Sequence, residues 1–185
     1  MINLINKPTI IGDNVILRPF KPSDISSIEE CLTDFEVKKF TGSQTDINSE
    51  VITKWYDSRN EQVNRLDLAI EDKNSKEVVG EAVINEYDAE THSMNFRILI
   101  GAKGRNRGLG SEATKLICNH IFLNTDLNQL TLSVFAFNAR AQRVYEKVGF
   151  VIDSIDKEDL EFEGEMIDSI NMRLTRDDWE KNRNL

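Results

Sequence analysis

The stretch that most constrains the fold runs from residue 94 to 123 and reads as a strand, a basic glycine loop and a helix. Phe96, Ile98 and Ile100 alternate with other residues, which is typical of an extended strand. After the loop, apolar residues recur at helical spacing over residues 113–121. A strand that leads through a short loop into a helix indicates an α/β architecture.

The loop between this strand and this helix, residues 101–110, has the character of an anion site. Its glycines let the backbone turn tightly and leave no side chain to block a ligand. The first N–H groups of a helix lack partners within it, and the helix dipole favours negative charge there. Lys103, Arg105 and Arg107 add positive charge. The loop therefore predicts a site for a phosphate or pyrophosphate. An ordinary strand-to-helix turn is the alternative.

Two specific nucleotide-binding motifs can be tested on the loop. A P-loop needs Lys followed by Ser or Thr directly after its last glycine, whereas Gly110 is followed by Ser111 and Glu112. A dinucleotide fold needs G-x-G-x-x-G/A, which residues 108–113 fit, and an acidic residue at the end of the next strand. That strand ends in Phe137 and Asn138, and the preceding chain resembles antiparallel hairpins. Both motifs are therefore disfavoured.

The composition indicates one globular domain over residues 1–185, with 39% hydrophobic and 30% charged residues. No apolar run approaches the roughly 20 residues of a membrane helix. The first residues lack the pattern of a secretory signal, so we expect a cytoplasmic protein without a membrane partner. Two cysteines, Cys31 and Cys118, are too few for a disulfide framework and are expected to be buried. With only two histidines as well, we expect no metal site.

The net charge of −9 argues against nucleic acid as a partner. Acidic residues crowd the segment 153–168, where Lys157 is the one basic residue. Such a run is either a solvated face or a surface that attracts a cationic substrate. A homo-oligomer is left open by the sequence.

Further elements follow from periodicity and from turn residues. Strands are expected at 9–11, 15–18, 66–70, 78–87, 130–136, 150–155 and 167–174, with a hairpin approach at 161–165. Helices are expected after an N-cap at Ser23, at 48–62 and between Asn138 and Gly149, with a loop at 41–46. Residues 176–183 are expected to form a short terminal helix or a tail.

The second half of the expected site lies on the helix that begins at Asn138. A helical crossover makes the strands 94–100 and 130–136 parallel neighbours, so their carboxyl ends meet at one edge of the sheet. Ligands in α/β sheets bind at that edge. Asn138 and Tyr145 are therefore expected beside the glycine loop.

These motifs together resemble the GCN5-related N-acetyltransferases (GNAT). The resemblance rests on Arg105-x-x-Gly108-x-Gly110 and on Asn138 followed by Tyr145-Glu-Lys-Val-Gly-Phe150. The segment LRPFKPSD at 17–24 and the closing acidic hairpin are similar to the subgroup of ribosomal-protein N-terminal and spermidine acetyltransferases. The resemblance implies a mixed, mostly antiparallel twisted sheet, splayed at the central strand, with helices on both faces. It also implies acetyl-CoA as cosubstrate and an amine as acceptor.

The resemblance assigns roles residue by residue. The backbone of Ile98, Leu99 and Ile100 would pair with the pantetheine arm as an added strand. Asn138 would hydrogen-bond the cofactor near that arm, Arg143 would reach its phosphates, and Tyr145 would protonate the leaving thiolate. The main-chain N–H groups of one run would wrap the pyrophosphate: Arg105, Asn106, Arg107, Gly108, Leu109, Gly110 and Ser111.

The chemistry agrees with the role of Tyr145. An amine attacks a thioester directly, and a phenol with an ordinary pKa of about 10 can protonate a thiolate whose thiol has a pKa of about 8.5. A buried aromatic residue is the alternative reading, because Tyr145 shares an apolar face with Ala141 and Val148. Many relatives carry a carboxylate as base on the central strand where this chain has Asn95, and Asn cannot take up a proton.

Candidates for the missing base are Glu81 and Glu86 on the preceding strand, or a chain of waters. Either glutamate can equally be an exposed strand residue. The acceptor is expected to be a basic protein N-terminus or a small amine, with a polyamine as the alternative. Asn95 makes a polyamine-specific enzyme less favoured, and it also leaves room for a non-catalytic acyl-CoA binding module.

Overall fold

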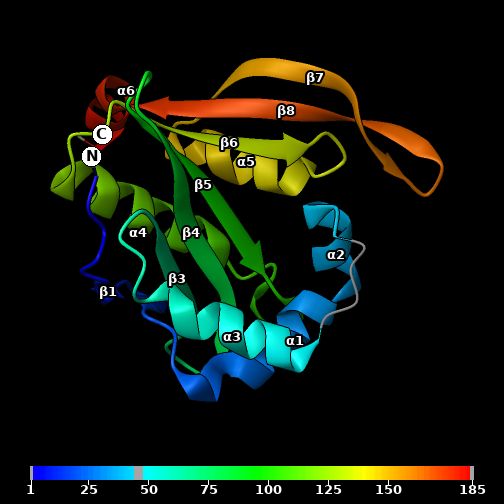
Figure 1. Ribbon diagram of the computed structural model, residues 1–185. Coiled ribbons are helices and arrows are strands. Elements are labelled where there is room, and N and C mark those ends of the chain that lie inside the picture. Colours follow the sequence, from blue (N-terminus) through cyan, green and yellow to red (C-terminus); the bar gives the residue numbers. More distant parts are fainter. Residues whose placement is uncertain (1, 44–47, 184–185) are drawn as a thin grey trace.

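The computed structural model describes residues 2–43 and 48–183, and these form an eight-stranded sheet in the order β1-β2-β3-β4-β5-β6-β8-β7. All neighbouring strands are antiparallel except β5 and β6, which run parallel as expected. Figure 1 shows the two parts of the sheet diverging from each other. The strands are β1 (Ile10–Ile11), β2 (Val15–Arg18), β3 (Leu66–Asp72), β4 (Val78–Asp88), β5 (Ser93–Ile100), β6 (Gln129–Phe135), β7 (Val151–Phe162) and β8 (Glu165–Thr175).

The sheet splays between its two parallel strands. Residues 93–95 of β5 pair with residues 129–131 of β6, and the pairing ends there. On its other side β5 stays paired with β4 up to Ile100. One backbone edge of β5 is therefore free of strand partners from Phe96 onward, within the described residues. This confirms the splayed sheet that the resemblance implied.

Helices cover both faces of the sheet. The elements are η1 (Pro22–Asp24), α1 (Ile25–Thr33), α2 (Phe35–Thr41), α3 (Ser49–Arg59), η2 (Ala102–Gly104), α4 (Leu109–Asn124), α5 (Ala139–Val148) and α6 (Arg176–Arg183). The larger core cluster joins α4 and α5 to the sheet, with Phe96, Ile117 and Phe150 nearly inaccessible to solvent. A smaller cluster, which includes Ile28, Ile52 and Tyr56, packs α1 and α3 on the opposite face. Both predicted buried cysteines are buried.

Three local predictions needed correction. Ser23 does not cap α1, because residues 22–24 form a 3-10 turn and Asp24 bonds to Arg18 instead. The helix α2 was not predicted, although Asp34 caps its start and Gly42 ends it in the left-handed conformation. Of the loop predicted at 41–46, Thr41 is instead the last residue of α2, and residues 44–46 lie outside the described residues.

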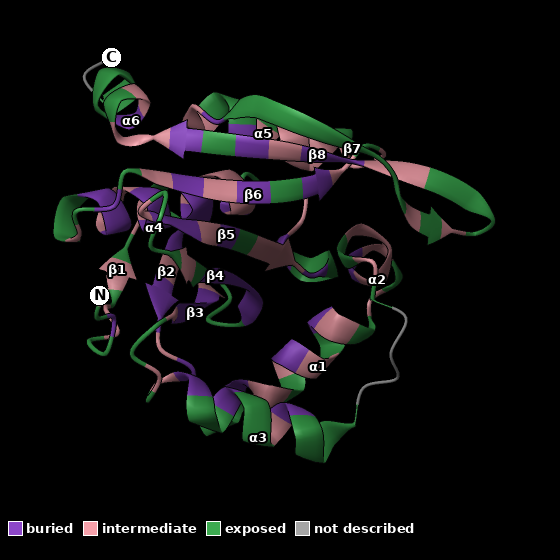
Figure 2. Ribbon diagram, turned by 45° about the horizontal axis from the view of Figure 1, so that its top comes forward, coloured by how far each residue is buried: buried purple, intermediate pink, exposed green. Residues whose placement is uncertain are grey.

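The strands β7 and β8 extend further than their sequence patterns indicated, and they form one long arm. The predicted strand 150–155 continues to Phe162 because two register shifts carry it past irregular pairs. Figure 2 shows β7 exposed along most of its length, at the edge of the sheet. None of the helices in the described part of the chain is long and apolar enough to cross a membrane.

Candidate functional site

A cavity of about 660 Å³ lies where β5 and β6 part. Residues of α2 and residues of α4 and α5 line the same cavity, so it extends through the gap between the two strands. We name two parts of this cavity after the roles that the resemblance implies. The part next to β5, the 101–111 loop and α5 is the cofactor half. We call the part bounded by α2, β4, the end of β6 and the β7–β8 arm the acceptor half.

The cofactor half contains the free edge of β5 and the start of α4. Ile98, Leu99 and Ile100 line the cavity, and their edge toward β6 has no strand partner. Gly108 caps α4 with a φ of 77° and without a side-chain cap, and a Cβ there would meet no atom within 4 Å. The first turn of α4, whose N–H groups lack partners within the helix, therefore lies on the cavity wall, where an anion can bind. Five predicted phosphate-loop residues line this half: Asn106, Gly108, Leu109, Gly110 and Ser111.

Arg105, which also lines the cavity, is held in place by carboxylates. Asp34 accepts hydrogen bonds from its Nη1 at 2.6 Å and its Nη2 at 3.1 Å. Glu36 Oε2 lies 3.1 Å from its Nε and also 3.1 Å from Nη2 of Arg140. The hydrogen bond from Arg105 holds the pKa of Asp34 below its usual value. The loop that lines the cavity is thereby tied to the start of α2.

Two of the predicted phosphate contacts lie elsewhere. Arg107 pairs with the buried Asp72 at 2.8 Å and does not line the cavity. Arg143 is exposed on the outer side of α5 and is likewise absent from the cavity wall. Arg140, which the sequence analysis passed over, lines the cavity and donates from Nη1 to Asn106 Oδ1 at 3.1 Å. Although Arg140 and Arg143 are neighbours one turn apart on α5, Arg140 is half-buried at the cavity and Arg143 is exposed.

Asn138 and Tyr145 lie together on the cavity wall, as predicted. The Asn138 side chain caps α5 by accepting from Ala141 N at 3.2 Å. Tyr145 is 8% exposed and its ring packs edge-on to Phe96. Burial raises the pKa of Tyr145, so its phenol stays protonated throughout the neutral range. This environment suits both readings of Tyr145, as a core aromatic residue and as a proton donor.

The two candidate bases occupy very different environments. Glu81 lines the cavity, is 4% exposed and accepts a hydrogen bond from Tyr56 Oη at 2.6 Å. Nη2 of Arg97 lies 3.8 Å from Glu81 Oε1. Burial raises the pKa of Glu81 above its usual value.

Glu86 does not belong to the cavity. It is exposed, has a φ of 55° and sits at the irregular end of β4 where the pairing with β5 shifts. Asn95 also lies away from the cavity wall and donates to Asn85 Oδ1 at 3.1 Å. The structure therefore brings Glu81 to the site and leaves Glu86 outside it.

The acceptor half is built mostly from residues that no motif marked. Phe40 and Thr41 come from α2, Phe135 from β6, and Asp159 and Ser169 from the arm. Ser169 Oγ donates to Asp159 Oδ2 at 2.6 Å. The signal that could have found α2 was the start at Asp34 and the stop at Gly42. The contribution of the arm depends on its tertiary path, which has no local signal.

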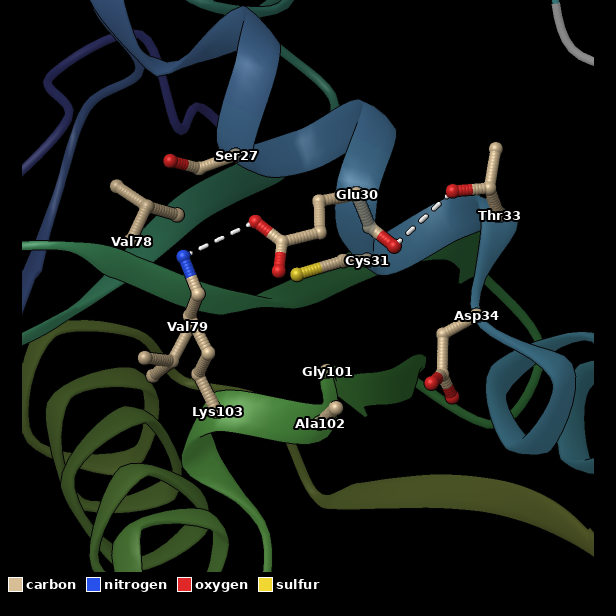
Figure 3. A pocket seen from close by; sticks show the side chains of 10 residues that line it. All are labelled: Ser27, Glu30, Cys31, Thr33, Asp34, Val78, Val79, Gly101, Ala102 and Lys103. Carbon is tan, nitrogen blue, oxygen red and sulfur yellow. Dashed lines mark hydrogen bonds and ion pairs between the residues drawn. The ribbon is translucent and has the colours of Figure 1, made fainter.

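A smaller cavity of about 130 Å³ lies behind the glycine loop, between α1 and the ends of β4 and β5. Figure 3 shows Lys103 reaching Glu30 across it, with the Cys31 side chain beside Gly101. A Cβ at Gly101 would lie 2.5 Å from Cys31 Sγ, so the glycine permits this close packing. At Gly101 the loop therefore packs closely against α1.

The family model, the relative and the solved structures that this chain is similar to are all described as acetyltransferases. Residues 14–151 match the family model described as an acetyltransferase (GNAT) domain. A prophage-derived uncharacterized N-acetyltransferase, YokL of Bacillus subtilis, is 22% identical over 92% of this chain and 95% of its own. The fold is similar to a spermidine N-acetyltransferase from Vibrio cholerae in complex with CoA and spermine, with a TM-score of 0.82, 18% identity, and 91% and 99% coverage. The fold is also similar to an acetyltransferase (GNAT family) from Bacillus anthracis, with a TM-score of 0.79 and 19% identity. That match covers 92% of this chain and 99% of the other.

Proposed function

The chain belongs to the GNAT acetyltransferase family and is an acyl-CoA-dependent N-acetyltransferase with acetyl-CoA as cosubstrate, and on that premise we propose that it acetylates a primary amine on a cationic acceptor. The acceptor is a basic protein N-terminus or a small amine, with a polyamine as the specific small-molecule candidate. One observation carries the proposal. The free edge of β5, the opening turn of α4 and Tyr145 face a single cavity that continues into the acceptor half.

The cofactor half fits acetyl-CoA. The free backbone edge from Ile98 to Ile100 offers hydrogen bonds to the amide groups of the pantetheine arm. The N–H groups at the start of α4 and the guanidinium groups of Arg105 and Arg140 suit its phosphates. Asn138, on the same wall, would bond to the arm. Arg107 and Arg143 have no part in this proposal because both lie outside the cavity.

Acetyl transfer needs one group to take up a proton and one to supply a proton. The neutral amine attacks the thioester carbonyl, a C–N bond forms, and the C–S bond breaks to release the thiolate of CoA. Tyr145 gives its proton to that thiolate and later regains one from solvent. Glu81 accepts the proton that the amine loses, through water if the amine does not reach it directly. Its raised pKa brings it toward the range in which a base is effective at neutral pH.

A cationic acceptor is supported by the acceptor half itself. Its wall contains the carboxylates of Glu81 and Asp159, and the chain carries a net charge of −9. The similar spermidine N-acetyltransferase is described with spermine bound. Attraction between an acidic site and a basic acceptor raises the local acceptor concentration and the association rate.

The test is a thiol-release assay with acetyl-CoA and a panel of amines that includes spermidine, a monoamine and a basic peptide that starts with Ser. We expect at least one cationic acceptor to accelerate release over hydrolysis. If acetyl-CoA binds in calorimetry and no acceptor accelerates thiol release, the chain is an acyl-CoA binding module and the proposal is wrong.

A further inference from the structure

An ammonium group rests on two aromatic rings at the outer rim of the acceptor half. Nζ of Lys39, on α2, lies 5.2 Å from the ring centroid of Phe137 and 5.8 Å from that of Phe162. A cation within about 6 Å of an aromatic ring is attracted to the negative face of the ring. In Figure 1, α2 lies below the arm formed by β7 and β8, close to the carboxyl end of β6. The rings therefore offer a cation site that a side chain of the protein itself fills.

One of the two rings, that of Phe137, packs against further aromatic residues that line the cavity. The centroid of Phe137 lies 5.8 Å from that of Phe135 and 5.9 Å from that of Phe40. Both Phe135 and Phe40 line the cavity wall. A continuous row of aromatic rings thus runs from the cavity wall, which also includes Glu81, to Phe162 at the rim. An extended aliphatic chain can lie along such a row, because its methylene groups pack against the rings.

The surroundings of Lys39 indicate that the rings are a favourable place for a positive charge. Acidic residues are abundant on the arm, where Glu161, Glu163 and Glu165 are all exposed. Yet within the described residues Lys39 makes no ion pair, and its ammonium group lies over the two rings. The nearby carboxylate of Glu36 is taken up by Arg105 and Arg140.

We propose that Phe137 and Phe162 form a binding site for a second alkylammonium group of the acceptor, and that Lys39 occupies this site until such an acceptor displaces it. The inference rests on the proposed function and adds to it the part of the acceptor that is recognised away from the reacting amine. One amine of the acceptor reacts next to Glu81 and Tyr145, while another, still protonated, lies on the rings. Polyamines and peptides with a lysine near the N-terminus both carry this group.

The experiment compares spermidine with butylamine at saturating acetyl-CoA. Phe162→Leu removes a ring and should raise the KM for spermidine about two- to fivefold, with the KM for butylamine unchanged. Lys39→Met removes the internal competitor and should lower the KM for spermidine. Phe35→Leu, an exposed ring on α2, and Lys38→Met, the neighbouring lysine, are the matched controls. They correct for a lost ring and for a lost charge.

Binding of spermidine measured by calorimetry in the presence of CoA makes the test independent of turnover. Weaker binding by Phe162→Leu and tighter binding by Lys39→Met, without turnover, would support the site and overturn the proposed function alone. Equal ratios of spermidine to butylamine KM in all four variants, with equal binding, would overturn the site. A Ser-starting peptide with and without a lysine at its third position then tells which source of the alkylammonium group the site prefers.

Discussion

The cofactor half and the acceptor half of the cavity are assembled in different ways. The cofactor half draws on two nearly continuous stretches, residues 96–111 and 138–145, which carry the glycine loop and the Asn138 helix. The acceptor half takes single residues from far apart in the chain, among them Phe40, Glu81, Phe135 and Asp159. A cofactor can be bound by backbone groups and helix termini, which a local stretch of chain supplies. Recognition of one particular acceptor needs side chains that packing brings together from distant parts of the chain.

This difference predicts that the largest effect lies where the halves meet, at Tyr145. We expect Tyr145→Phe to lower kcat by about 10²- to 10⁴-fold, because the leaving thiolate loses its proton donor. The affinity for CoA should change little, since the ring and its packing against Phe96 remain. Steady-state kinetics combined with calorimetry of CoA binding checks both parts. Tyr87→Phe, outside the cavity, is the control. An unchanged kcat in Tyr145→Phe would show that Tyr145 is a core residue and not the proton donor.

A second prediction separates the two candidate bases. Glu81→Gln should lower kcat by about 10²-fold, at the low end of general base catalysis because water can replace the carboxylate in part. Burial raises the pKa of Glu81, so the carboxylate form is reached only above the usual range. The wild-type rate should therefore fall as the pH drops below this raised pKa.

The matched control for Glu81 is Glu86→Gln. Glu86 is exposed and outside the cavity, so its variant should keep the wild-type rate and pH profile. The fall of the rate at low pH, the acid limb of the pH profile, should disappear in Glu81→Gln. Should the limb persist there, or move in Glu86→Gln, the assignment of the base to the acceptor half is wrong.

A third prediction concerns the connection between the halves, the pair of Asp34 and Arg105. Their side chains are 19% and 14% exposed, and the contact is bidentate. We expect Asp34→Asn to lower the free energy of unfolding by about 1–3 kcal/mol, since Arg105 then lacks its main charged partner. Asp57→Asn, at an exposed position of α3, should have almost no effect.

The pH dependence of that difference has a definite sign. Arg105 lowers the pKa of Asp34, so the pair stabilises the fold fully above the unfolded pKa of about 3.9. The contribution is lost as the pH falls through the lowered folded value. Denaturant unfolding of wild type and variant from neutral to acidic pH should show their curves converging. A difference that stays constant as the pH falls would show that the pair is not its source.

The uneven construction also explains what the sequence could and could not predict. The Asn138 cap follows from a local capping residue and the parallel β5–β6 pair from the length of the helical crossover, whereas the splay was expected only from the resemblance to the family. The helix α2 was missed because its seven residues carry too short a pattern, and the extended arm because its β7 pattern is broken by register shifts. Residues from these two elements supply much of the acceptor half.

The same limit applies within the cofactor half, where local spacing does not tell which of two neighbouring arginines on α5 lines the cavity. Arg140→Gln should raise the KM for acetyl-CoA about tenfold, the loss of roughly one charge-assisted hydrogen bond, because Arg140 lines the cavity beside Asn106. Arg143→Gln removes the same charge three residues further along α5, from an exposed position. It should leave that KM unchanged, and both variants should keep the wild-type kcat. An increase caused by Arg143→Gln instead would mean that α5 turns when the cofactor binds.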